Sequence, residues 1–286
     1  MQIKGFFDPR TSTVTYVVWD ENTSDAVVID SVLDYDPVAG RVYNDSADEV
    51  LEFLTANGLK LNWVFETHAH ADHISGSQYL KKKTGAGVVI GANITAVQSV
   101  FRDALNLGAD FAVDGSQFDK LLGEGETLSF GGLEVGVINT PGHTPACVTY
   151  HIGDALFAGD AMFMPDFGTG RCDFPGGSAE TLYDSVMNKL YTLPDETRVF
   201  VGHDYQPGGR ELAFETTIGA CKAGNIQLQG DTKREQFVQW RSARDATLNL
   251  PKLIFQSIQV NVDAGHLPKP EDNGKRYLKL PLNLFD

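Results

Sequence analysis

Four side chains of metal-binding type are crowded into the stretch THAHADH. They are His68, His70, Asp72 and His73, in a chain with only seven histidines. In a strand the first three would share a face without His73, and in a helix His70 would be turned away from the others. A loop that leads into a helix can instead aim the first two side chains one way and the last two another. The spacing therefore predicts two adjacent metal positions.

Three more residues of metal-binding type follow apolar runs elsewhere in the chain. His143 lies behind the Pro-Gly turn of TPGHT, Asp160 ends ALFAGD, and His203 follows VFVG. An imidazole or carboxylate at the end of a core strand is costly to bury unless it is paired or metal-bound. Each of the three alone is typical of a turn or of a hydrogen-bonded histidine. Together with the first four they predict a metal site.

The elements that would position these residues alternate between strands and helices. Runs rich in β-branched and apolar residues predict strands within 12–20, 25–32, 61–67, 85–91, 128–144, 146–160 and 198–205, the first two forming a hairpin. Helices are expected at residues 46–58, 93–106, 178–190, 210–221 and 233–248, with Ser46 and Ser178 as N-caps. This order is typical of a layered α/β sandwich. The candidate metal ligands would then lie on loops that follow its strands.

The overall composition is that of a soluble protein, with 42% hydrophobic and 21% charged residues. The net charge of −15 argues against nucleic acid and against an anionic membrane surface as partners, because both are held chiefly by Lys and Arg. The sequence shows neither a signal peptide nor a membrane span, so we expect a cytoplasmic protein. Its three cysteines provide no disulfide framework.

The motifs THAHADH, TPGHT, AGD and GHDY, in this order and spacing, resemble the metallo-β-lactamase superfamily over roughly residues 16–205. The resemblance implies a four-layer αββα fold with the metal site at one edge of the sheets. Residues 1–206 would form the catalytic core, and residues 207–286 a C-terminal helical extension packed on it rather than an independent domain. The superfamily contains several hydrolases and also iron enzymes, so the fold alone does not give the function.

A finer resemblance points to the persulfide dioxygenases, and among them to the bacterial proteins called β-lactamase-like hydrolases. It is carried by THAHADHISGS, FGTGRCDFPGGSAETLYDSV and RDATLNLPKLIFQSIQVNVDAG. It implies an enzyme with one non-haem Fe(II) per chain that oxidises glutathione persulfide with O₂ to sulfite and glutathione. The implied iron ligands are His68, His143 and Asp160, a 2-His-1-carboxylate triad that leaves positions open.

The same resemblance implies roles for the residues around the iron. Four residues would be hydrogen-bonding neighbours of the iron ligands or remnants of a second metal position. They are His70, Asp72, His73 and His203. Arg171 and Tyr205 would line the glutathione pocket, where an arginine fork suits a carboxylate. The alternative for Arg171 is an ion pair with Asp173. We also expect Arg241 and Arg244 on a solvated helix face, Cys147 in the core and Cys172 as an inert filler.

Two other functions remain open. The complete ligand set also suits a thioester hydrolase like glyoxalase II with two Zn(II), in which Asp160 bridges one zinc on His68, His70 and His143 and another on Asp72, His73 and His203. A metal- or sulfide-sensing protein is the third class, although open catalytic positions and an anion pocket exceed what a sensor needs. The expected sulfur-transfer partner is a rhodanese-type sulfurtransferase on a separate chain, and a homodimer is one option for the oligomeric state.

Overall fold

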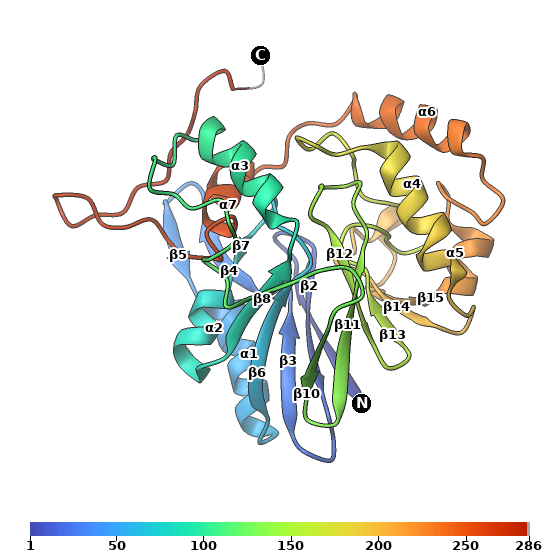
Figure 1. Cartoon of the computed structure of the whole chain (residues 1–286), viewed down its shortest axis with the longest axis horizontal. Coiled ribbons are helices and arrows are strands. Elements are labelled where there is room, and N and C mark those ends of the chain that lie inside the picture. The colour runs from blue at the N-terminus through green and yellow to red at the C-terminus, as the bar shows by residue number, and fades with distance from the viewer. Residues whose placement is uncertain (285–286) are drawn as a thin grey trace.

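One half of the molecule is a sheet that carries its helices on one face. The computed structural model describes residues 1–284. The strands of this sheet are β1 (Gln2–Asp8), β2 (Thr13–Trp19), β3 (Asp25–Ile29), β6 (Lys60–Glu66), β8 (Gly87–Gly91) and β9 (Lys120–Leu122), in the spatial order β1-β2-β3-β6-β8-β9. Its helical layer consists of α1 (Asp45–Ala56), α2 (Ser77–Thr84), α3 (Ile94–Ala104) and α7 (Ile254–Asn261), as Figure 1 shows.

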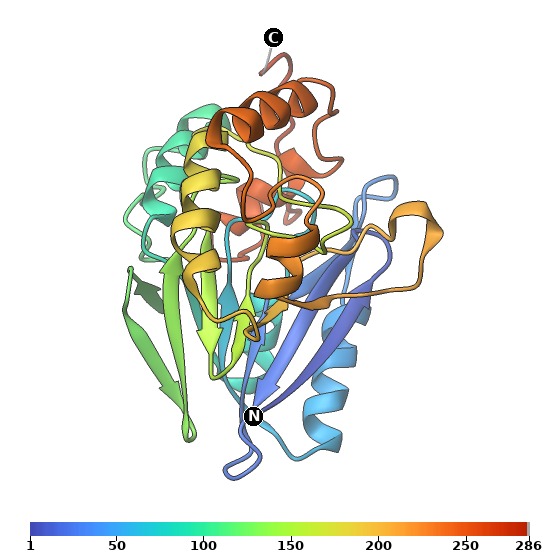
Figure 2. The ribbon, with the colours of Figure 1, turned by 90° about the vertical axis from the view of Figure 1, so that its right-hand side faces the viewer.

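The other half repeats this plan. Its strands follow one another in sequence and in space, as β10 (Thr127–Phe130), β11 (Leu133–Asn139), β12 (Val148–Ile152), β13 (Ala155–Phe157), β14 (Arg198–Phe200) and β15 (Glu215–Thr217). Its outer helices are α4 (Ala179–Asn188), α5 (Ile218–Gly224) and α6 (Arg234–Asp245), which face the viewer in Figure 2. Two 3₁₀ turns are η1 (Leu190–Thr192) and η2 (Pro207–Gly209). A small sheet pairs β5 (Arg41–Tyr43), β4 (Val32–Asp36) and β7 (Ile74–Ser75).

The main core lies between the two six-stranded sheets. Val14, Tyr16 and Val18 of β2 face the second sheet, whereas Val17 packs among the residues under α1 and α2. Successive side chains of a strand point to opposite faces, so a strand buried on both faces is apolar throughout. The four-layer αββα sandwich predicted from the sequence is confirmed. Within residues 1–284, no helix is both long enough and apolar enough to span a membrane.

Two local predictions differ from the structure. Residues 210–221, predicted as one helix, contain strand β15 and the start of α5, because Glu215–Thr217 pair antiparallel with β14. Ser46 does not cap α1, which begins at Asp45, and its hydroxyl donates to Asp34 instead. Ser178 does cap α4, since its hydroxyl accepts a hydrogen bond from the Thr181 N–H.

The segment that follows residue 206 contacts both halves of the sandwich. Phe237 of α6 is buried with Leu182 of α4 beside the second sheet. Ile254 and Ile258 of α7 are buried with Val88 of β8 beside the first sheet. These contacts support our proposal that residues 207–286 extend the core rather than form an independent domain.

Candidate metal centre

Four loops at the same edge of the sandwich carry the predicted ligands. The loop from β6 to β7 holds His68, His70, Asp72 and His73. His143 lies between β11 and β12, and Asp160 and His203 follow the ends of β13 and β14. The structure therefore brings all seven side chains together. Six of them are buried, and Asp72 is half-buried.

Two glycines let these loops approach one another. Gly142, directly before His143, has a φ of 143°, and a Cβ there would lie 2.4 Å from the Leu182 Cα in the first turn of α4. A Cβ on Gly170 would lie 2.2 Å from the backbone oxygen of Asp160. No other residue fits at these distances, so both positions require glycine. They fix the backbone next to His143 and Asp160.

The first ligand group consists of His68, His143 and Asp160, whose donor atoms all lie within 4.8 Å of one another. The His143 Nε2 is 3.5 Å from the Asp160 Oδ2. Among the described residues, the His68 Nε2 and the Asp160 Oδ1 are buried without a hydrogen-bond partner. Leaving such atoms unpaired is costly. A metal cation bound by the three side chains would remove that cost, so the donor set fits a metal.

Neighbouring groups orient the two histidines of this triad. The His143 Nδ1 lies 2.6 Å from the backbone oxygen of Arg171, and the His68 Nδ1 lies 3.0 Å from the Thr67 hydroxyl. Metal-binding histidines usually engage their second ring nitrogen in this way. Burial, together with the nearby imidazoles, holds the pKa of His68 well below its ordinary value. The neutral imidazole is the form that binds metals.

A second group consists of His70, Asp72 and His203, again with donor atoms within 4.8 Å of one another. The His203 Nε2 is 3.6 Å from Asp72 and 3.4 Å from Asp160, so Asp160 lies next to both groups. The His73 Nδ1 is 3.0 Å from the Asp72 Oδ2, and its Nε2 is buried without a partner among the described residues. Burial opposes the charge on Asp72, but His203 and His73 outweigh it and hold the pKa of Asp72 well below its ordinary value.

This grouping differs from the one expected from the spacing, which paired His68 with His70. The two rings are only 4.1 Å apart, yet His70 clusters with Asp72 and His203. Its Nε2 is held 3.0 Å from Asp30 and 3.4 Å from Glu66. Burial works against the charged form of His70, but the two carboxylates outweigh it and raise the pKa of His70 well above its ordinary value.

Sequence reasoning missed three residues that support the ligand loop. Asp30 directly follows the apolar run AVVI, so the strand-end signal that indicated Asp160 could have indicated it too. Glu66, at the end of β6, follows the apolar run WVF and carries the same signal. Asn261 of α7 donates hydrogen bonds of 2.8 Å to the backbone oxygens of His70 and His73. It lies 188 residues or more along the chain from both, so no local pattern could have indicated the contact.

A cavity of about 220 Å³ adjoins the first ligand group at His143 and Arg171. Most of its wall is apolar, formed by Ala71, Phe174, Pro175, Leu250, Pro251 and Ile254. Arg171 pairs with Asp173 through two hydrogen bonds of 2.6 Å and donates a third, of 2.7 Å, to the Asn249 carbonyl. The ion pair considered as an alternative from the sequence is therefore present. Arg171 nevertheless lines the cavity.

Tyr205 flanks the other side of the centre. Its ring is stacked on the His203 imidazole, with centroids 5.5 Å apart, and packs against Phe167 at 4.6 Å. The side chain remains 43% exposed, so it can contact a ligand in solution. Arg171 and Tyr205 thus lie beside different ligand groups, one near His143 and the other near His203.

Arg241 is buried, so the expectation of a solvated helix face is wrong for this residue. Its guanidinium pairs with Asp245 and donates to the Thr169 carbonyl at 3.3 Å. Asp245 accepts the backbone N–H of Cys172 at 2.8 Å, because α6 packs directly under the Arg171 loop. Arg244 is exposed, as expected. Cys172 is buried, as is Cys147, which confirms the core position predicted for Cys147.

Comparison with known proteins identifies the family. Residues 8–203 match the family model of the metallo-beta-lactamase superfamily. The chain belongs to this superfamily. The crystal structure of ETHE1 from Myxococcus xanthus superposes on the chain with a TM-score of 0.75 at 36% identity, covering 93% of this chain and 100% of that one. The superfamily resemblance seen in the motifs is thus confirmed.

Three curated relatives carry different names. Mouse mitochondrial persulfide dioxygenase ETHE1 is 34% identical over 71% of this chain and 68% of its own length, so the homologues of the chain include persulfide dioxygenases. A beta-lactamase hydrolase-like protein of Agrobacterium fabrum is 50% identical over 99% of this chain, which spans 65% of that protein. Glyoxylase B2 of Dictyostelium discoideum is 46% identical over 99% of this chain and 97% of its own length.

Proposed function

We propose that this chain is an iron(II) persulfide dioxygenase that converts glutathione persulfide to sulfite and glutathione. The observation that carries the proposal is the buried triad of His68, His143 and Asp160, in which the donor atoms of two members have no hydrogen-bond partner among residues 1–284. Two histidines and one carboxylate, with positions left open, are typical of non-haem iron(II) oxygenases. The persulfide dioxygenases among the homologues support the same reaction.

Iron(II) held by the triad would supply the redox-active centre at which O₂ oxidises the outer persulfide sulfur. The residues of the chain place the substrate. The apolar cavity beside His143 takes up the organic part of the thiol and excludes water. Arg171, held by Asp173, lines the cavity and would bind a glutathione carboxylate through its guanidinium.

Protons must leave the centre during the reaction. The balanced reaction consumes the persulfide, O₂ and water, and it yields the thiol, sulfite and two protons. The His203 Nε2, which lies 3.6 Å from Asp72 and 3.4 Å from Asp160, is placed to accept one of them. The persulfide would come from a rhodanese-type sulfurtransferase on another chain, which forms such species by transferring sulfur to a thiol.

The second ligand group favours an alternative function. Because His70, Asp72 and His203 also converge, and the His73 Nε2 has no partner within the described part of the chain, a second metal could bind next to the first. Two zinc ions held by the two ligand groups, with Asp160 next to both, would supply the chemistry of a thioester hydrolase, in line with the name of the Dictyostelium relative. This alternative requires the second group to bind metal as tightly as the first.

Metal analysis of protein purified without oxygen separates the two functions. The dioxygenase proposal predicts about one iron per chain and little zinc, as a mononuclear triad requires. Two zinc ions per chain, together with hydrolysis of S-lactoylglutathione, would establish the alternative and end the proposal.

A further inference from the structure

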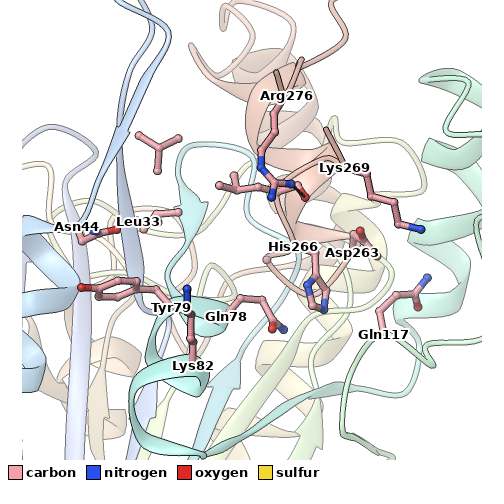
Figure 3. Close-up of a pocket in the computed structure, with 13 residues that line it drawn as sticks. Leu33, Asn44, Gln78, Tyr79, Lys82, Gln117, Asp263, His266, Lys269 and Arg276 are labelled. Atoms are coloured by element: carbon pink, nitrogen blue, oxygen red, sulfur yellow. Dashed lines mark hydrogen bonds between the residues drawn. The ribbon is translucent and has the colours of Figure 1, made fainter. Parts of the chain in front are cut away.

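A larger pocket, of about 640 Å³, lies away from the metal centre between α2, the small sheet and the segment that follows α7 (Figure 3). None of the seven predicted metal ligands lines it. Its volume is that of a site for a small organic molecule. The proposed reaction gives it no role.

The charged side chains that line this pocket are mostly cationic. The cationic side chains are Lys82, Lys269 and Arg276, and Asp263 is the one carboxylate in the lining. In Figure 3, Arg276 reaches down from the C-terminal segment towards His266, and Lys82 rises from α2 on the opposite side. Three cations gathered in a chain of net charge −15 indicate a local preference for anions.

Among the described residues, none of these cations forms an ion pair within 4 Å, although the charge of Lys269 acts on the nearby Asp263 carboxylate. Neither Lys82 nor Lys269 forms an ion pair or side-chain hydrogen bond with any described residue. Within residues 1–284, Arg276 donates only to the backbone oxygens of Leu267 and Pro268. The neighbouring Lys81, by contrast, is paired with Asp119. The charges of Lys82 and Arg276 in particular are therefore available to a ligand.

The floor of the pocket is apolar. Leu33, Val42 and Leu267 line it. Below them they pack on Ile74 and Val260, in a small cluster of the core. A ligand that matches both the apolar floor and the cationic side chains has an apolar body and acidic groups. The lysine ammonium groups and the arginine fork suit a carboxylate or a phosphate equally well.

We propose that this pocket binds a small organic anion that carries carboxylate or phosphate groups, at a site separate from the metal centre. The acidic groups lie between Lys82, Lys269 and Arg276, and the apolar body lies on Leu33 and Leu267. Because the pocket shares no residue with the metal ligands, this inference does not depend on which metal the chain holds.

Calorimetric titration of the full-length, metal-loaded protein tests the site. The probes are AMP, which has a phosphate and an aromatic body, and glutarate, which has two carboxylates. We expect saturable binding of at least one probe at low salt, and weaker binding at high salt because the charges are exposed. Binding of AMP alone assigns the phosphate class, and binding of glutarate alone assigns the carboxylate class. If neither probe binds with a Kd below about 1 mM, the proposal is overturned.

Single substitutions locate the binding. Lys82→Gln and Arg276→Gln should each weaken it by roughly three- to tenfold, the range for a partly exposed charged contact. Lys275→Gln removes the same charge one residue from Arg276 but outside the lining, so it should leave the affinity unchanged. An equal loss with Lys275→Gln would indicate unspecific attraction and contradict the proposal. Loss of binding only with Arg171→Ala would place the anion at the metal centre and contradict it as well.

Discussion

The side-chain amide nitrogen of Asn261 lies 2.8 Å from the backbone oxygen of His70, a residue 191 positions earlier in the chain. The same nitrogen donates to the His73 carbonyl, and the Asn261 oxygen accepts the Ser75 N–H at 2.9 Å. All of these groups are buried, so water cannot replace the hydrogen bonds. Helix α7 therefore fixes the loop that carries four of the candidate ligands.

Replacing Asn261 with leucine should loosen this loop. The change leaves two carbonyls and one N–H buried without partners, so we expect the free energy of unfolding to fall by about 3 kcal/mol. We also expect metal affinity to fall roughly tenfold, as is usual when a residue that positions metal ligands is lost. Metal retained after dialysis against a chelator series measures the second effect.

Gln259→Leu is the matched control for this change. Gln259 lies on the same helix and bonds the backbone of Phe255 and Lys279, but it does not contact the metal loop. Its loss should lower stability and leave metal affinity intact. Equal metal affinity in Asn261→Leu and Gln259→Leu would show that Asn261 does not position the ligands.

The two ligand groups should respond differently to histidine removal. His143→Ala takes one of three ligands from the proposed iron site, so iron content and activity should both be lost. His203→Ala removes a member of the second group and should retain about one iron per chain while turnover falls. Iron content and circular dichroism, measured on the same samples, separate metal loss from unfolding. Loss of iron in His203→Ala as well would contradict a mononuclear site.

Arg171→Ala tests the substrate pocket. The lost guanidinium contact should raise KM for glutathione persulfide by about tenfold and leave kcat nearly unchanged, because a carboxylate far from the reacting sulfur is bound equally in ground and transition states. Arg234→Ala, at an exposed ion pair with Asp184, serves as the control and should change neither constant. A large fall in kcat at constant KM would assign Arg171 to the chemical step instead.

The three cysteines should be inert in the folded protein. Burial raises the pKa of Cys147 to about 12 and that of Cys221 to about 12, and it also raises the pKa of Cys172. A raised thiol pKa means that the neutral form persists to high pH, so at pH 8 only roughly one thiol in ten thousand is ionised. Ellman's reagent should label them only after denaturation. Fast labelling of a thiol in the native chain would point to a reactive Cys172.

Much of the centre could be predicted from the sequence, because each ligand follows a short apolar run that fixes where a strand ends. The arrangement of the ligands was harder to predict. His70 depends on Asp30 and Glu66, and the loop depends on Asn261, so the deciding contacts are long-range. A local pattern reports the direction of a side chain within one element, and it carries no information about a partner on another element.

The errors in secondary structure have the same origin. Glu215–Thr217 form a strand because they pair with the edge of β14, although the surrounding residues favour a helix. Ser46 has the residue type of an N-cap, but the buried Asp34 takes its hydroxyl. In both places tertiary contacts outweigh local propensity.

Oxygen uptake on glutathione persulfide tests the central claim most directly. With iron-loaded protein in an oxygen electrode, we predict O₂ consumption that starts on addition of the persulfide and yields about one sulfite per O₂, as the balanced reaction with a redox-active iron requires. No oxygen uptake by the iron-loaded protein, together with hydrolysis of S-lactoylglutathione by the zinc-loaded protein, would contradict the account.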